Sequence, residues 1–247
     1  MRVYESGDSG ITNKADDTPL TLADLAAHHV IVDGLNKLEI AYPILSEEAA
    51  NIAYEERSTW SRYWLIDPLD GTKEFIKRNG EFTVNIALIE NGIPVLGVVY
   101  APVLDVCYYG ALGIGAHIQR GTTPAQTIKA RAAQTGETLK VVSSRSHTDE
   151  RTHALLAKLG NHECISMGSS LKLCLVAEGV AHFYPRLGPT MEWDTAAAHA
   201  VVSVAGGSVC DWTGEELHYN KADLLNPEFF VMHQRDKTQR LANATAA

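Results

Sequence analysis

Two aspartates in one short motif are the first residues that suggest chemistry. The run from Trp64 to Thr72 reads WLIDPLDGT, so Asp67 and Asp70 lie three positions apart with Pro68 between them. The apolar residues before them predict the end of a buried strand, which we expect to stop at Asp67 because proline cannot continue a ladder. Such a turn presents two carboxylates and the Leu69 carbonyl, the kind of oxygen ligands that Mg²⁺ takes. The alternative is a plain turn whose aspartates cap a following helix.

Further acidic residues stand at the edges of other predicted elements. Glu47 and Glu48 end the run PILSEE, and Asp194 follows Trp193 at the start of a run of small residues. Each has a simpler interpretation, because glutamate pairs are usually solvated and Asp194 could be a helix N-cap. Three separated acidic points are nevertheless what a multi-metal site needs, in which cations bind the attacking water and the leaving oxygen of a phosphoryl transfer.

The combination WLIDPLDGT, LSEE and WDTAA resembles the inositol monophosphatase superfamily of Mg²⁺-dependent, Li⁺-sensitive phosphatases. Within it, KEFIKRNGEFTVN from Lys73 to Asn85 is similar to the 3'(2'),5'-bisphosphate nucleotidase branch, the CysQ type. The resemblance runs from about residue 14 to about residue 231. It implies an α+β fold, the layered α/β/α/β/α sandwich of the inositol monophosphatase and fructose bisphosphatase type, with the metal site between two halves.

The resemblance implies two or three Mg²⁺ ions at this site. Their ligands would be Glu47, Asp67, the Leu69 carbonyl, Asp70 and Asp194, with Glu47 preferred to Glu48 because the first Glu of the motif matches the family ligand. Thr72 would orient the attacking water with Asp16 or Glu47 behind it, since KADDTPLT resembles the family segment that supplies the partner of this threonine. From spacing alone, Asp16 would be an ordinary loop charge.

The second half carries candidate substrate contacts. In GSSLK, the Ser169 hydroxyl and the Lys172 ammonium lie one helical turn apart, beside backbone amides that could hold a phosphate. A helix-capping serine and a solvated lysine are the alternative. Arg186, in a segment bounded by proline and glycine, could bind a phosphate with its guanidinium fork. The full set of substrate contacts implied by the resemblance is Gly71, Thr72, His147, Ser169, Lys172, Arg186 and Asp194.

A second basic pocket favours a bisphosphate over a simple sugar phosphate. The resemblance therefore implies removal of the 3'-phosphate of adenosine 3',5'-bisphosphate to give AMP and phosphate, an activity tied to sulfur assimilation. Inositol or sugar phosphatase activity on the same scaffold is one alternative, and a non-catalytic nucleotide-binding sensor is another. A haloacid-dehalogenase-type phosphatase is disfavoured, because its two aspartates are two positions apart rather than three.

Composition limits the partners. The 247 residues are 45% hydrophobic and carry a formal charge of −9, which argues against a general binder of nucleic acid polymers or of membrane surfaces. We expect a small-molecule nucleotide bisphosphate as partner, and a monomer or a homodimer. The four cysteines form no CxxC pair, which suits a reducing cytoplasm, and no apolar run approaches the length of a membrane span. Peripheral attachment to the inner membrane is left open.

We expect one phosphatase domain over 1–247, with a metal-binding half (1–136), a substrate-binding half (137–232) and a frayed tail (233–247). Thr21 and Asp24 predict a capping box for a helix over 22–38, whose apolar stripe would comprise Leu22, Leu25, Ala26, Val30, Val32 and Leu35. Residues 49–62 should form a lid-like or plain surface loop. Asn91 and Gly92 predict a tight hairpin between strands 83–90 and 93–101.

Overall fold

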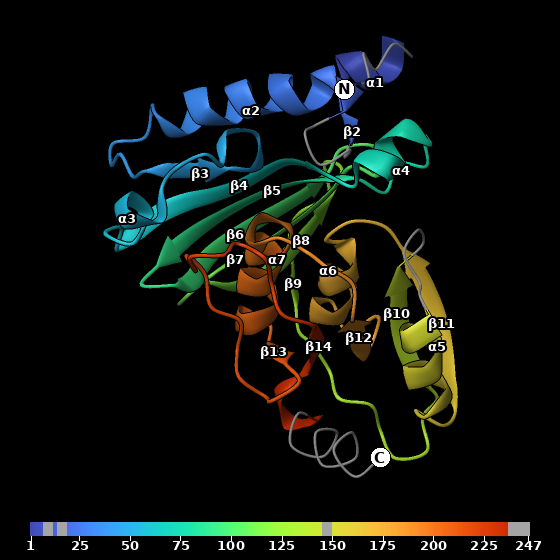
Figure 1. The fold of residues 1–247 in the computed structure, drawn as a ribbon. Helices are drawn as coiled ribbons and strands as arrows, with labels where there is room; N and C mark the ends of the chain where they lie inside the picture. The colour runs from blue at the N-terminus through green and yellow to red at the C-terminus, as the bar shows by residue number, and fades with distance from the viewer. Residues whose placement is uncertain (7–11, 14–18, 145–149, 237–247) are drawn as a thin grey trace.

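Helical layers and β-sheets alternate through the molecule (Figure 1). The computed structural model describes residues 1–6, 12–13, 19–144 and 150–236. Helices α1 (Arg2–Ser6) and α2 (Leu22–Leu35) lie outside the first sheet, and α6 (Leu171–Ala177) and α7 (Glu192–Val204) lie between the sheets. Helix α5 (Glu150–Ala157) covers the second sheet from outside. The predicted α/β/α/β/α sandwich is therefore confirmed.

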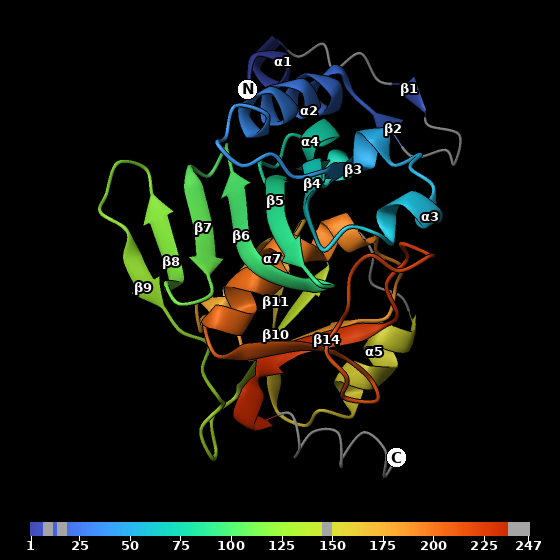
Figure 2. The ribbon, with the colours of Figure 1, turned by 90° about the vertical axis from the view of Figure 1, so that its left-hand side faces the viewer.

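The first sheet has seven strands in chain order (Figure 2). Its strands are β3 (Ile44–Ser46), β4 (Arg62–Asp70), β5 (Thr83–Glu90), β6 (Ile93–Ala101), β7 (Val106–Ala111), β8 (Gly115–Arg120) and β9 (Gln126–Ile128). The β3–β4 pair is parallel, and every later neighbour is antiparallel. A separate two-stranded pair is formed by β1 (Thr12–Asn13) and β2 (Pro19–Leu20).

The second sheet is mixed and has the strand order β11-β10-β12-β14-β13. Its strands are β10 (Leu139–Ser144), β11 (His162–Met167), β12 (Phe183–Arg186), β13 (Gly207–Asp211) and β14 (Phe229–His233). Both partners of β10 run parallel to it, whereas β14 is antiparallel to β12 and β13. The division of the chain into a metal-binding and a substrate-binding half stays a prediction. Of the tail expected to fray from residue 233, His233 belongs to β14 and residues 234–236 are helical, and the rest lies outside the described residues.

The hairpin prediction at Asn91 and Gly92 is confirmed. Both residues have positive φ, 51° and 78°, as the two central positions of a tight hairpin turn require. The strand prediction at Pro68 is wrong, because β4 continues to Asp70 and pairs again with Thr83. The ladder shifts register between Asp67 and Asp70, so Pro68 falls in a bulge, where its missing N–H breaks no ladder bond.

Helix α2 begins at the predicted place but presents a different face. The Thr21–Asp24 capping box forms as expected. The predicted stripe is wrong, because Leu22, Leu25 and Val30 are exposed while Asp24 is buried. Among the described residues, no helix combines the length and the apolar character needed to cross a membrane.

The segment 49–62, predicted as a lid-like or surface loop, follows the short helix η1 (Glu47–Ala49) and contains the helix α3 (Tyr54–Arg57). Arg57 at the end of α3 is buried, and its guanidinium donates to the Lys221 and Ala222 carbonyls and to the Asn220 side chain. Arg57 therefore ties this segment to the second half of the chain, and the choice between a lid-like and a plain surface segment stays a prediction.

Helix α7 packs directly on the first sheet because both elements carry small residues where they touch. Its Ala196, Ala197 and Ala200 are buried, and Gly97 of β6 faces them. A Cβ at position 97 would lie 2.0 Å from the Ala197 carbonyl oxygen. The close approach of the helix backbone to the sheet therefore requires glycine at this position.

We expect Gly97→Ala to lower the free energy of unfolding by about 1–3 kcal/mol, the usual cost of overpacking. The melting temperature should fall by roughly 2–4 °C for each kcal/mol in a chain of this size. The matched control is Gly34→Ala in α2, where an added Cβ meets nothing within 4 Å. It should be neutral or stabilising by up to ~1 kcal/mol. Equal melting temperatures for both variants would contradict the contact described here.

Candidate active site

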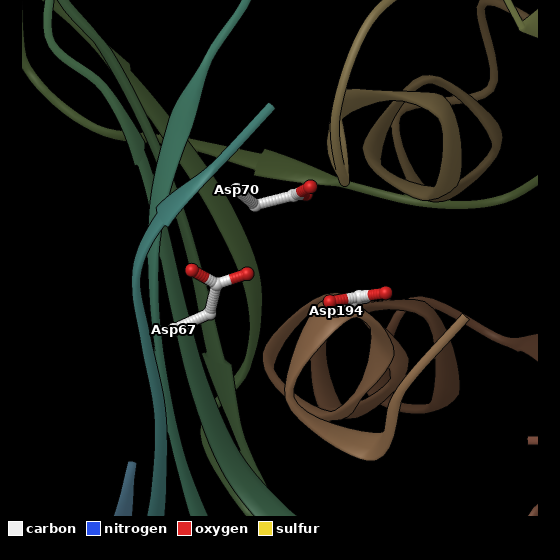
Figure 3. Close-up of side chains that lie close together, drawn as sticks. All are labelled: Asp67, Asp70 and Asp194. Atoms are coloured by element: carbon white, nitrogen blue, oxygen red, sulfur yellow. The ribbon is translucent and has the colours of Figure 1, made fainter. Parts of the chain in front are cut away.

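Three carboxylates from two distant parts of the chain converge between the sheets. Asp67 and Asp70 project from β4 and Asp194 from α7 towards one space (Figure 3). Each offers one oxygen atom, and these atoms all lie within 4.8 Å of one another. Oxygen ligands of this kind, at this separation, suit a hard divalent cation such as Mg²⁺.

Local backbone structure holds each of these aspartates. In the bulge of β4, the Leu69 N–H donates to Asp67 Oδ1 at 2.9 Å. Gly71 then adopts a φ of 91°, a conformation that favours glycine, and α4 (Thr72–Ile76) begins after it. Asp194 is not the helix N-cap, because it is the third residue of α7 and its Oδ2 accepts from the Met191 N–H at 2.8 Å.

The acidic groups repel one another strongly. Burial raises the pKa of Asp67 well above its ordinary value, and the charges of Glu47, Asp70 and Asp194 raise it further. Burial also raises the pKa of Asp194, and the Asp70 charge adds to this. The pKa of Asp70 is raised by burial too, although Lys172 and the Ser170 N–H oppose that shift. The cluster is short of positive charge, and a bound cation would supply it, so these residues fit Mg²⁺.

The structure separates the two adjacent glutamates. Glu47 lines the same cavity as the three aspartates, and its charge raises the pKa of Asp67. The charge of Glu48 acts instead on Asp24 and His28 of α2. This placement supports the choice of Glu47 over Glu48.

The cavity has a volume of about 340 Å³, within the range of small-molecule sites. Every predicted site residue that the structure describes lines it: Glu47, Asp67, Leu69, Asp70, Gly71, Thr72, Ser169, Lys172, Arg186 and Asp194. Asp16 and His147 lie outside the described residues.

Two cationic side chains line the cavity together with the carboxylates. Lys172 is only 7% exposed, so its interpretation as a solvated charge is wrong. Its Nζ donates to the Ser169 carbonyl, and burial lowers the pKa of Lys172 to about 8 while the Asp70 charge opposes the shift. The Arg186 guanidinium donates to the Gly188 and Pro189 carbonyls, which fix it at the rim of the cavity.

Several residues that line the cavity, notably Ser170 and Tyr184, were not among the site residues predicted from the sequence. The N-cap of α6 is Ser170 rather than Ser169, and Ser169 has a φ of 46°, uncommon for a residue with a side chain. Tyr184 lies in β12, with the Lys172 Nζ 5.8 Å from its ring centroid. The motif GSSLK contains Ser170, but its spacing drew attention to Ser169 and Lys172, and Tyr184 lies outside every motif singled out.

Comparisons with known proteins agree with the fold described above. The model of the inositol monophosphatase family matches residues 2–247. The proteins named 3'(2'),5'-bisphosphate nucleotidase CysQ from Salmonella typhimurium and Escherichia coli K12 are 54% and 53% identical to this chain, each over 94% of it and 92% of the relative.

A crystal structure of CysQ from Bacteroides thetaiotaomicron superposes with a TM-score of 0.84 at 45% identity, and the match covers 95% of this chain and 91% of that one. A Thermotoga maritima IMPase superposes with a TM-score of 0.77 at 25% identity, over 99% and 92% of the two chains. Motifs, fold and full-length matches agree: this chain belongs to the inositol monophosphatase family, and within that family it groups with the CysQ proteins.

Proposed function

We propose that this protein is a Mg²⁺-dependent, Li⁺-sensitive phosphatase that removes the 3'-phosphate of adenosine 3',5'-bisphosphate and releases AMP. One observation carries the proposal: a single cavity holds the carboxylate cluster and also Lys172 and Arg186. The carboxylates suit metal ions at the phosphate to be cleaved, and the two cations suit a second phosphate on the same substrate. The CysQ relatives are named for this nucleotidase activity.

In this proposal Glu47, Asp67, Asp70 and Asp194 hold two or three Mg²⁺ ions, together with the Leu69 carbonyl. When bound, the ions polarise the phosphate and lower the pKa of the attacking water. Thr72 orients that water, with Asp16 or Glu47 behind it, and Gly71 and Thr72 contact the phosphate. No side chain is needed as a nucleophile.

The remaining residues bind the rest of the nucleotide. Lys172 and Arg186 neutralise the 5'-phosphate, while Ser169 and His147 add hydrogen bonds, and Asp194 faces the sugar as well as the metal. The four cysteines are free thiols in the structure, which fits the proposed cytoplasmic location. The choice between monomer and homodimer, and attachment to the inner membrane, stay predictions.

The test is phosphate release from adenosine 3',5'-bisphosphate, inositol 1-phosphate and fructose 1,6-bisphosphate with Mg²⁺, each with and without Li⁺. Preference for the nucleotide, with activity lost on adding Li⁺, is the expected result. Faster turnover of inositol 1-phosphate would retain the metal site and reject the nucleotide as substrate. Binding of the nucleotide without any phosphate release would point to a sensor.

Asp67→Asn should abolish activity, a loss of roughly 10³-fold or more, because several kcal/mol of charge stabilisation depend on its carboxylate. The variant should still fold, since asparagine has the same shape and removes a buried charge repelled by its neighbours. In the presence of a chelator, the melting temperature of this variant should equal or exceed that of the wild type. The rise in melting temperature on adding Mg²⁺ should disappear.

The control is Asp33→Asn, which changes an exposed aspartate of α2 far from the cavity lining. This variant should retain wild-type activity and the same response to Mg²⁺. An active Asp67→Asn protein would reject the assignment of the metal site.

Lys172→Met tests the second phosphate site. Methionine keeps the length of the buried side chain and removes the ammonium. We expect kcat/KM for adenosine 3',5'-bisphosphate to fall roughly 10–100-fold, the range for a lost hydrogen bond to a charged group. Adenosine 3'-monophosphate, which lacks the 5'-phosphate, should lose much less. Equal losses for the two substrates would remove Lys172 from this role.

A further inference from the structure

Strand β5 carries polar residues at positions where the core would require apolar ones. Its inward face consists of Thr83, Asn85, Ala87 and Ile89, all of them almost completely buried. The last two are ordinary core residues. The first two stand opposite Asp70 and Asp67 in the ladder with β4, so the polar end of this face lies directly behind the metal-binding motif.

The two polar side chains meet Ser170 at the start of α6. The Ser170 Oγ lies 2.8 Å from Asn85 Oδ1 and 2.9 Å from Thr83 Oγ1, and Ser170 is 1% exposed. The Ser170 N–H donates to Asp70 Oδ2 at 2.5 Å. One residue of the second half is thus bonded to the metal-binding strand through its backbone and to the neighbouring strand through its side chain.

The donors and acceptors of this network can be assigned. A carboxylate only accepts, so the Asn85 amide nitrogen faces Asp70 Oδ2, at 3.5 Å, and its oxygen faces Ser170. The single hydroxyl hydrogen of Ser170 is then donated to Asn85. Thr83 then donates to Ser170 Oγ, and its hydroxyl also lies 3.5 Å from Asp70 Oδ2, so both hydroxyl hydrogens of the network have an acceptor.

A second bond holds the same loop from the other side. The Gly168 N–H donates to Glu81 Oε2 at 2.8 Å, and a Cβ at position 168 would lie 2.7 Å from the Glu81 carbonyl oxygen. The loop of residues 168–170, which leads into α6 with Lys172, is thereby fixed to the segment that precedes β5.

We propose that Ser170, held by Thr83 and Asn85, is a positioning residue that orients Asp70 for metal binding. It also fixes the loop of residues 168–170, the substrate loop, to the metal-binding strand β4. Nothing in the chemistry assigned to Asp67, Asp194 or Lys172 requires this hydroxyl. Groups that orient a ligand commonly change metal affinity 10–100-fold when they are removed, although they never touch the ion. The inference rests on the proposed function only in taking Asp70 as a Mg²⁺ ligand.

The experiment measures Mg²⁺ binding to the full chain by calorimetry, without substrate, alongside the Mg²⁺ dependence of phosphate release. Ser170→Ala keeps the N–H that bonds Asp70 but removes the hydroxyl that bonds Thr83 and Asn85, so the segment that carries this N–H loses its anchor on β5. We expect about tenfold weaker Mg²⁺ binding, with a matching rise in the Mg²⁺ concentration for half-maximal activity. Ser170→Thr retains an Oγ and should restore both values to within about twofold of the wild type.

The matched control is Ser208→Ala in β13, which also removes a buried serine hydroxyl, one that is bonded to Glu216 and not to the cavity. It should bind Mg²⁺ as the wild type does. Unchanged Mg²⁺ affinity in Ser170→Ala, or an equal loss in Ser208→Ala, would overturn the proposal.

Thr83→Val decides the question if Ser170→Ala fails to melt cooperatively. Valine has the shape of threonine and lacks the hydroxyl that bonds Ser170 at 2.9 Å and lies 3.5 Å from Asp70 Oδ2, so a smaller loss of Mg²⁺ affinity in the same direction is expected. Wild-type affinity in this variant would overturn the proposal. A wild-type protein that binds no Mg²⁺ would instead reject the proposed function, and a wild type that binds Mg²⁺ but hydrolyses another phosphate would leave this inference standing.

Discussion

The repulsion between carboxylates that share one enclosed space is the constraint on which the rest of the site depends. Burial and neighbouring carboxylate charges raise the pKa values of Asp67 and Asp194, and the Arg186 charge opposes the shift of Asp194 only in part. Such an arrangement is unfavourable without a cation and requires a rigid frame to persist. The bulge of β4 and the first turn of α7 supply that frame, since each fixes one aspartate through a backbone N–H.

The frame works only if the two halves approach closely. Small residues on α7 and Gly97 on β6 let the helix backbone lie against the first sheet, which brings Asp194 to Asp67 and Asp70. On the other side of the cavity, the bonds from Ser170 to Asp70 and Asn85 fix the substrate loop to the same sheet. Apolar packing and a small buried polar network thus serve one purpose. They hold the metal ligands from separate elements at fixed positions relative to one another.

Much of this could be predicted from the sequence, because the motifs carry local chemistry. WLIDPLDGT places two carboxylates by spacing alone, and Asn91-Gly92 dictates a hairpin. What failed was decided by tertiary structure. Pro68 did not end β4, since a bulge in the pairing with β5 removes it from the ladder, and α2 buries Asp24 while its Leu22, Leu25 and Val30 stay exposed. The role of Ser170 depends on β5, far away in the chain, so no local pattern could indicate it.

The position of α7 between the sheets also sets the order of events during synthesis. Asp194 leaves the ribosome on the order of ten seconds after Asp67, at ordinary elongation rates. The helix that carries it must pack between a first sheet that is already synthesised and a second sheet whose last strands, β13 and β14, are still to come. The nascent chain therefore holds an incomplete set of the proposed ligands until Asp194 has been synthesised, about four fifths of the way along the chain.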